Sequence, residues 1–424
     1  MGFRRSFKNK SFLSFWVAQL ISQFGDRINQ MALVGLVAGR EFGSAMELAK
    51  LLTFTIIPVF IVGPIAGVYV DRWDRKTTLF VCDLIRGVII LLIPLVFIGQ
   101  HSLLPIYVIV FLAFCLSRFY VPAKMSIIPE IVDPDQLHVA NSLATVTGMI
   151  AFVLGALMGG LIVEYMGAKG GFICDSITFF ISAFLVSLIV PKKFNVRPLE
   201  IVDRSREMAT TYRDVLREMR RGIRYILAHR DIRDIINLML ILFMAAGAVY
   251  TVIIVFVQES FGSVTKHLGF LAVALGAGLF LGSLAYGKWG RKKDHFGTIF
   301  TCLSAGGLMM AAFALAVQRL HNIWVALALA GFMGFVVGPI VIAANTVVHL
   351  VCSQKMQGKI FSSLEMVIHF GFLATMLLSS KLSEYISGFW ILLVVGLSFC
   401  VIGFGGLMSH KHGQLVRAPE HMKT

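Results

Sequence analysis

Charged residues are scarce in this sequence. Only 14% of its 424 residues are Asp, Glu, Lys or Arg, whereas 57% are hydrophobic. An ordinary soluble domain carries about 25% charged and about 45–50% apolar residues. The shortage of charge therefore excludes a soluble enzyme and a disordered chain. The length fits twelve membrane helices of roughly 20 apolar residues each.

Patterns of a metal, disulfide or nucleotide site are also missing from the sequence. The six cysteines fall in or beside hydrophobic stretches, without the CxxC or Cys/His spacing of a zinc site. His410, His412 and His421 have no such framework either. There is no G-x-x-x-x-G-K-[ST] loop for ATP. We therefore expect no cofactor, no metal and no disulfide, with an ion gradient as the driving force.

What the sequence does contain is a series of long apolar runs separated by short polar connections. We predict an all-α membrane protein with 12 transmembrane helices. Residues 1–10 are too short and too polar for a cleaved signal peptide, so we interpret them as a cytoplasmic tail. The predicted spans are 12–39, 48–70, 77–99, 104–124, 138–163, 171–190, 235–258, 267–287, 296–317, 322–350, 360–380 and 386–408.

One long polar stretch divides the predicted spans six and six. This stretch predicts four parts: an N-terminal six-helix bundle at 1–190, a cytoplasmic middle loop at 191–234, a C-terminal six-helix bundle at 235–409 and a cytoplasmic tail at 410–424. In the middle loop, apolar residues at helical spacing alternate with arginines, which favours a basic amphipathic helix on the inner leaflet. A solvated linker helix is the alternative.

The net charge of +15 is distributed unevenly along the chain. Of the 38 lysines and arginines, 29 fall on segments predicted to be cytoplasmic and 6 on the outer loops. This bias predicts a protein of the cytoplasmic (inner) membrane with both termini in the cytoplasm. It also explains the positive charge without nucleic acid as a partner. We expect a monomer in the lipid bilayer.

A short motif recurs in the two halves of the chain. Asp71-Arg72-Trp73-Asp74-Arg75-Lys76 follows the second apolar run, and Gly287-Lys288-Trp289-Gly290-Arg291-Lys292 follows the eighth, about half the chain later. Internal duplication of this kind is common in secondary transporters, which bind substrate between the two halves.

The first copy of this motif resembles the signature G-x-x-x-D-R-x-G-R-K of the major facilitator superfamily. Asp74 stands where the second Gly of the signature is usual. The resemblance implies two pseudo-symmetric six-helix bundles (the MFS fold) and a cytoplasmic gate that holds the outward-facing state. Plain anchoring of positive charge to the membrane is the alternative. The matching residues are Gly67, Asp71, Arg72, Arg75 and Lys76.

Physical roles can be assigned to this predicted gate motif. Gly67 is small, so we expect it to let two helices approach closely, while Arg72 and Arg75 find carboxylates or lipid phosphates. Asp83 and Arg86 are three residues apart, and we predict a local salt bridge that extends the same network. A direct role in transport is the alternative.

Other stretches resemble the macrolide and enterobactin exporters, a branch of drug:proton antiporters. They include Phe24-Gly25-Asp26, Pro122-Ala123-Lys124 and 358–362. Lysophospholipid transporters share the first two patterns. Antiporters of the superfamily often carry G-P-x-x-G-G in the fifth span, and this chain lacks that proline. Its small residues there still permit close helix packing: Gly155, Gly159 and Gly160.

Ionisable residues inside predicted spans are expensive and are therefore candidates for function. Asp26 lies in the middle to outer part of the first span. A carboxylate that alternates between a desolvated and a paired environment can take up and release a proton. We predict that Asp26 carries the coupling proton or contacts a cationic substrate group; a permanently paired structural carboxylate is the alternative.

Further polar residues complete the set of candidates for coupling or substrate binding. Glu365 and His369 are four residues apart and share a helix face, which predicts a second protonation site or a structural pair. Asp175, close to the outer start of the sixth span, is expected to be a cap or surface carboxylate. The remaining candidates are Gln23, Arg27, Asn29 and Arg118.

These observations favour a proton-coupled exporter of an amphiphilic small molecule, such as a drug, macrolide or siderophore, working by alternating access. A lysophospholipid transporter of the same fold is the first alternative. A membrane sensor or scaffold without transport is the second.

Overall fold

The structure is a computed structural model that describes residues 8–40, 43–97, 102–191, 217, 220, 230–289, 295–351 and 354–411. The amphipathic helix predicted within 191–234 falls almost entirely outside the described residues, as does the C-terminal tail from residue 412 on. The regular elements are α2 (Lys10–Ala38), α3 (Ala45–Ile61), α4 (Gly63–Arg72), α5 (Arg75–Leu92), a π-helical turn η1 (Ile93–Phe97), α6 (Leu104–Ile131), a 3-10 turn η2 (Pro134–Gln136), α7 (Leu137–Ser187), α9 (Arg230–Phe261), α10 (Lys266–Trp289), α11 (His295–Leu320), α12 (Ile323–Val351), α13 (Gln354–Leu382) and α14 (Gly388–Lys411).

The predicted all-α class is confirmed, since the described residues form helices and no strand. Nine described helical segments are long and apolar enough to cross a membrane. The exact number of twelve crossings stays a prediction.

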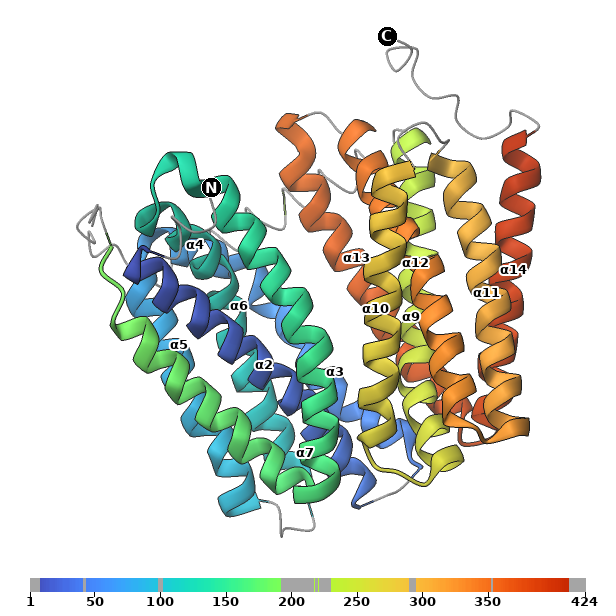
Figure 1. The fold of residues 1–424 in the computed structure, drawn as a ribbon, viewed down its shortest axis with the longest axis horizontal. Coiled ribbons are helices and arrows are strands. Elements are labelled where there is room, and N and C mark those ends of the chain that lie inside the picture. The colour runs from blue at the N-terminus through green and yellow to red at the C-terminus, as the bar shows by residue number, and fades with distance from the viewer. Residues whose placement is uncertain are drawn as a thin grey trace. The chain divides into compact units, whose positions relative to one another are not determined.

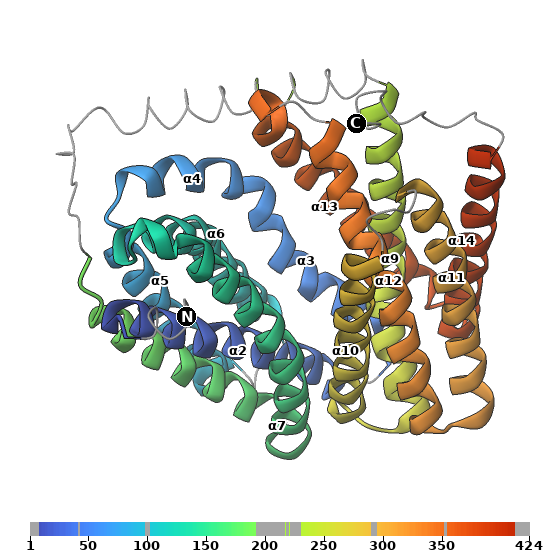
Figure 2. The ribbon, with the colours of Figure 1, turned by 45° about the horizontal axis from the view of Figure 1, so that its top comes forward.

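The second predicted span is built from two helices instead of one. Pro58 lies inside α3, and α4 begins at Gly63 with a proline next to it in its first turn. Proline removes a backbone donor and is favoured at the first positions of a helix. The chain therefore changes direction between α3 and α4 (Figure 2).

The fifth and sixth predicted spans form the two limbs of α7, joined at Gly167. This residue has a φ of +70° within an otherwise helical stretch, a conformation that glycine adopts at no steric cost. The second limb therefore starts right after residue 167, earlier than the predicted start at 171. Residues near its beginning are accordingly deeper in the helix than expected.

By contacts the chain divides into two compact units, which we describe separately. The first comprises Met1–Phe42, Lys50–Arg217 and Val264–Gly269. Within it, α2 lies along both limbs of α7 (Figure 1). Asn9 caps α2 by accepting hydrogen bonds from the backbone N–H groups of Ser11 and Phe12, at 3.1 and 3.3 Å. Its own amide donates to the Ile131 carbonyl at 2.6 Å and ties the start of α2 to the end of α6.

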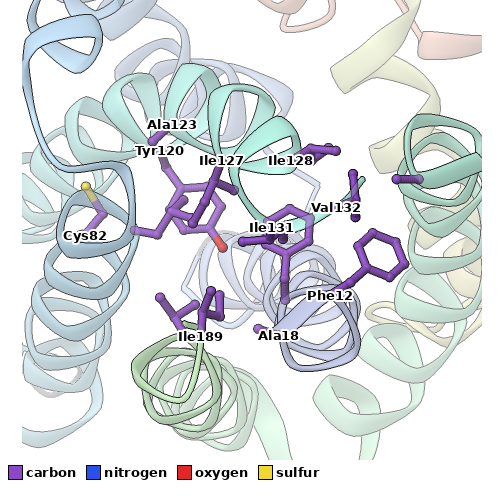
Figure 3. Close-up of a cluster of buried hydrophobic side chains, with 14 of the residues drawn as sticks. Phe12, Ala18, Cys82, Tyr120, Ala123, Ile127, Ile128, Ile131, Val132 and Ile189 are labelled. Atoms are coloured by element: carbon purple, nitrogen blue, oxygen red, sulfur yellow. The ribbon is translucent and has the colours of Figure 1, made fainter. Parts of the chain in front are cut away.

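A buried apolar cluster packs these helices together (Figure 3). It contains Phe12 and Phe15 from α2, Leu79 and Cys82 from α5, and several residues from the second half of α6. Tyr120 belongs to this cluster through its ring, while its hydroxyl points towards polar groups. Tyr120 therefore connects the apolar core of the first unit to the polar side chains beside it.

The second unit comprises Gly43–Ala49, Glu218–Ser263 and Phe270–Thr424. Here α11 packs against α12 and α14, and α9 against α13. Thr375 donates to the carbonyl of Met244 at 2.5 Å, and the hydroxyls of Thr251 and Ser380 are 2.5 Å apart. Such hydrogen bonds between helices are typical of membrane bundles.

Candidate functional site

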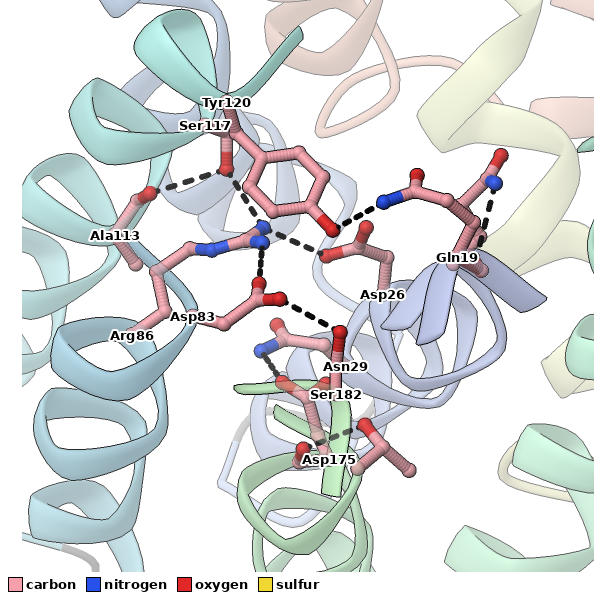
Figure 4. A network of polar contacts seen from close by, with 12 residues as sticks. Gln19, Asp26, Asn29, Asp83, Arg86, Ala113, Ser117, Tyr120, Asp175 and Ser182 are labelled. Atoms are coloured by element: carbon pink, nitrogen blue, oxygen red, sulfur yellow. Dashed lines mark hydrogen bonds and ion pairs between the residues drawn. The ribbon is translucent and has the colours of Figure 1, made fainter. Parts of the chain in front are cut away.

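A cluster of charged side chains lies inside the first unit (Figure 4). Its centre is Arg86 on α5, whose side chain is only 2% exposed. One guanidinium nitrogen pairs with Asp83, which is fully buried. The other lies 3.5 Å from Oδ1 of Asp26 on α2 and donates to Ser117 Oγ on α6 at 3.2 Å. One buried cation thus joins two acids from different helices.

Two aromatic rings enclose the same guanidinium. The central carbon of Arg86 is 4.5 Å from the ring centre of Tyr120 and 4.2 Å from that of Phe179. Cation–π contacts of this kind gain strength when the cation is desolvated. The Tyr120 hydroxyl accepts a hydrogen bond from Gln19 Nε2 at 2.6 Å. Rings and acids together compensate for burying this charge.

The two acids that contact Arg86 differ sharply in their surroundings. Asp83 is fully buried and also accepts a hydrogen bond from Ser182 Oγ at 2.6 Å. Asp26 has 43% of its side chain exposed and holds Arg86 through a single longer contact. Asp83 is therefore the enclosed partner of the arginine, and Asp26 is the partner whose side chain is partly exposed.

This arrangement corrects the grouping predicted for Asp83 and Arg86. The salt bridge between them is present, and its partners among the described residues are Asp26, Ser117 and Ser182. The reason is helical rise: Asp83 lies eight residues, or about 12 Å, along α5 from its first residue. That distance places the pair well inside the helix, away from the loop that carries the motif.

The expectation that Asp175 is a cap or surface carboxylate is wrong. Its side chain is completely buried on the second limb of α7. Oδ2 accepts a hydrogen bond from the amide of Asn29 on α2 at 2.5 Å. The error came from the predicted start of the span, because the limb begins at Gly167 and places Asp175 about 12 Å into it.

The other candidates on α2 have contacts of their own. The amide of Gln23 donates to the Gln19 carbonyl at 3.2 Å. Arg27 donates to the side chain of Gln30 at 2.9 Å, and its guanidinium lies 4.9 Å from the ring centre of Phe152. Arg27 thus faces another side of α2 from Asp26. Arg118 is half-buried on α6.

The glycines of the fifth span lie where helices meet. A Cβ on Gly155 would be 2.8 Å from Cβ of Arg27, and one on Gly159 would be 2.9 Å from Cα of Ile28. A Cβ on Gly160 would be 2.7 Å from the Thr265 carbonyl oxygen. Gly155 and Gly159 therefore let the first limb of α7 approach α2 closely, and Gly160 lets it approach the residues at the start of α10.

The predicted gate motif surrounds the junction of α4 and α5. Arg75 pairs with Glu130 at the end of α6, at 3.5 Å. Arg72 is exposed, Lys76 is half-buried, and the side chain of Asp71 is outside the described set. Among the described residues, no atom lies within 4 Å of a Cβ placed on Gly67, so the close helix approach expected there stays a prediction.

The residue that departs from the family signature has a structural role. Asp74 is the N-cap of α5 and accepts a hydrogen bond from the Thr77 N–H at 2.7 Å. Asp is among the best N-cap residues, whereas Gly is only slightly worse. Asp74 therefore departs from the family signature but still caps the start of α5.

We expect Asp74→Ala to destabilise the protein by about 1 kcal/mol, because the cap hydrogen bond is lost. Asp74→Gly is expected to cost only a few tenths of a kcal/mol. Thermal unfolding of the detergent-solubilised variants measures both. Equal losses for the alanine and glycine variants would contradict the capping role.

Glu365 and His369 lie in the second unit, on α13. The ring Nδ1 of His369 is 2.7 Å from the backbone carbonyl oxygen of Glu365, and the Glu365 side chain is exposed. The histidine therefore bonds to the backbone of its predicted partner and not to its carboxylate.

The sequence did not single out several members of the charged cluster. Ser117, Phe179 and Ser182 are ordinary residues in their spans, and no local spacing connects them to Arg86. A signal did exist for Asp175, because a buried acid in a span needs a partner and Asn29 was already a candidate. With the break at Gly167 known, the pairing of Asp175 with Asn29 becomes predictable from the sequence.

Comparisons with known proteins agree with the fold. The sequence profile described as Major Facilitator Superfamily matches residues 15–316 and 236–421. The chain is 28% identical to the "Uncharacterized MFS-type transporter YkuC" of Bacillus subtilis (strain 168), over 84% of this chain and 81% of that protein. It is 21% identical to macrolide efflux protein A of Streptococcus pyogenes, over 72% of this chain and 73% of that protein.

Among solved structures, the fold is similar to that of a bacterial homologue of the iron transporter ferroportin in its inward-facing state. The TM-score is 0.71 at 12% identity, covering 93% of this chain and 98% of that one. At this identity the likeness concerns the fold alone.

Proposed function

Because this chain belongs to the major facilitator superfamily, we propose that it exports an amphiphilic small molecule in exchange for protons, by alternating access. The family and the related proteins are transporters and not enzymes. Export of a macrolide-like compound is supported by the likeness to macrolide efflux protein A. We place the protein in the cytoplasmic membrane with both termini inside, acting as a monomer.

We also propose that the halves predicted at 1–190 and 235–409 move against each other. The division of the chain into two compact units supports this part of the proposal. The predicted middle loop, 191–234, would then connect the moving halves.

The observation that carries the proposal is the contact between half-exposed Asp26 and buried Arg86, at 3.5 Å. A proton reaching Asp26 removes the negative charge that attracts the guanidinium. Arg86 stays neutralised, because it keeps Asp83 and its two aromatic neighbours. Protonation therefore releases Asp26 from Arg86 without leaving an unpaired charge in the membrane.

We expect Asp26→Asn to abolish proton-driven transport while leaving the protein folded, because asparagine resembles the protonated carboxyl and cannot release a proton. The measurement is uptake of a radiolabelled macrolide into inside-out proteoliposomes under an imposed pH gradient. Asp135→Asn, on an exposed residue of η2, is the matched control.

Transport by Asp26→Asn at the rate of the wild-type protein would contradict the coupling role of this residue. A fluorescent lysophospholipid in the same vesicles tests the substrate class. Transport of that lipid in place of the macrolide would overturn the proposed export of drug-like molecules.

A further inference from the structure

Asp175 is a buried acid that the proposed exchange between Asp26 and Arg86 does not use. It lies on the second limb of α7, where this limb crosses α2. A Cβ on Gly25 would be 2.7 Å from Oδ1 of Asp175, so the backbone of α2 lies directly against the carboxyl group. The next residue, Ser176, donates to the Gly87 carbonyl at 2.6 Å and attaches the limb to α5. The carboxyl group is thus enclosed from two sides.

The hydrogen bonds of Asp175 are too few for an ionised carboxylate. Oδ2 has the bond with Asn29, whereas Oδ1 is buried and has no hydrogen-bond partner among the described residues. Oδ1 of Asn29 is also buried and unpartnered. An ionised carboxylate offers about four acceptor sites, but a neutral carboxyl group needs only one donor bond and one weaker acceptor bond.

The charges that face Asp175 do not neutralise it. Asp26 faces it from α2, and Asp83 and Arg86 face it from α5; η1 carries no titratable side chain. The only cation among these groups, Arg86, already contacts Asp83 and Asp26 (Figure 4). Three ionised carboxylates around one guanidinium would leave excess negative charge in a desolvated region, where an isolated charge is very costly.

We propose that Asp175 is a second proton-binding carboxylate of this transporter, neutral in the conformation of this structure and held by Asn29. In the neutral state its O–H donates to the side-chain oxygen of Asn29, with the two atoms of that amide exchanged. After this exchange the Asn29 oxygen faces the carboxyl group, and its nitrogen takes the buried place that the oxygen held. Its role in the transport cycle rests on the proposed function, whereas its protonation does not.

Infrared spectroscopy of the purified full-length protein tests the protonation directly. Protein labelled with carbon-13 at the aspartate carboxyl is expected to show, at neutral pH, the C=O band of a protonated carboxyl that resists exchange with bulk solvent. The band disappears in Asp175→Asn and persists in Asp26→Asn and in the exposed control Asp135→Asn. Absence of the band from the wild type, or its persistence in Asp175→Asn, would overturn the proposal.

A second variant covers the case in which Asp175→Asn does not fold. Asn29→Leu keeps the carboxyl group and removes its hydrogen-bond partner, so the C=O band is expected to move to higher frequency. An unchanged frequency contradicts the pairing with Asn29.

The role in transport has its own measurement. In proteoliposomes, Asp175→Asn is expected to lower the number of protons moved per substrate molecule by one while retaining substrate binding. An unchanged ratio would overturn the role in the cycle. Since the infrared band requires no turnover, failure of the proposed export and failure of the protonated Asp175 remain distinguishable.

Discussion

Replacing Arg86 with methionine is expected to cost about 3–5 kcal/mol of stability and to abolish transport. Methionine fills similar space but leaves Asp83, which is completely buried, without its cation. Removing one partner of a buried ion pair is strongly destabilising, because the remaining charge is neither solvated nor compensated. Chemical unfolding of the detergent-solubilised protein measures the loss of stability, and vesicle uptake measures transport.

A double variant separates the two consequences of this substitution. Asp83→Asn in the Arg86→Met background removes the orphaned charge, so most of the stability is expected to return. Transport is expected to stay absent, because Asp26 has no arginine to release. The matched control is Arg319→Met, since Arg319 is exposed at the end of α11. If Arg86→Met costs no more than this control, the cluster is not the charge centre that the structure indicates.

Gly25→Val is expected to destabilise the first unit by about 3 kcal/mol or more. A Cβ at this position would be 1.8 Å from Thr178 Oγ1 and 2.9 Å from Thr178 Cβ, far inside contact distance. Overpacking a well-filled helix interface commonly costs about 1–3 kcal/mol, and here α2 would also have to move away from Asp175. The measurement is the unfolding free energy compared with that of the wild type.

Gly67→Ala is the matched control for this prediction. Its Cβ would meet no atom within 4 Å, so the better helix propensity of alanine is expected to raise stability by about 0.5–1 kcal/mol. Thr178→Ala combined with Gly25→Val removes the nearest clashing atom and should recover part of the loss. Equal stabilities for Gly25→Val and Gly67→Ala would refute the close approach of α2 and α7 at Gly25.

The two glycines show what a motif does and does not predict. Both stand in patterns that resemble those of known transporters, but only Gly67 was predicted to let two helices approach closely. Only the neighbouring helix decides whether the missing side chain matters: α7 lies against Gly25, whereas no described atom lies within 4 Å of a Cβ on Gly67. Composition and spacing describe one chain segment at a time and hold no information about that neighbour.

In the charged cluster, too, the sequence predicts contacts within one helix but not contacts between helices. The spacing of Asp83 and Arg86 predicted their ion pair, since residues three apart lie on one helix face. Asp26 is 60 residues from Arg86 in the chain, and only helix packing brings it to the guanidinium. Asp175 was misplaced for a related reason, because one backbone conformation at Gly167 shifted the start of its limb.

Hydropathy and charge alone determined that this protein is helical and built for a membrane, because an apolar segment in lipid must satisfy its own backbone hydrogen bonds. Local residues also determined where helices begin, as Asn9 and Asp74 do for α2 and α5. Only the tertiary structure decided which charges meet. The packing of α2, α5 and α7 places Asp26 and Asp83 against a single arginine and Asp175 against Asn29, and a buried charge depends on whichever groups the fold places around it.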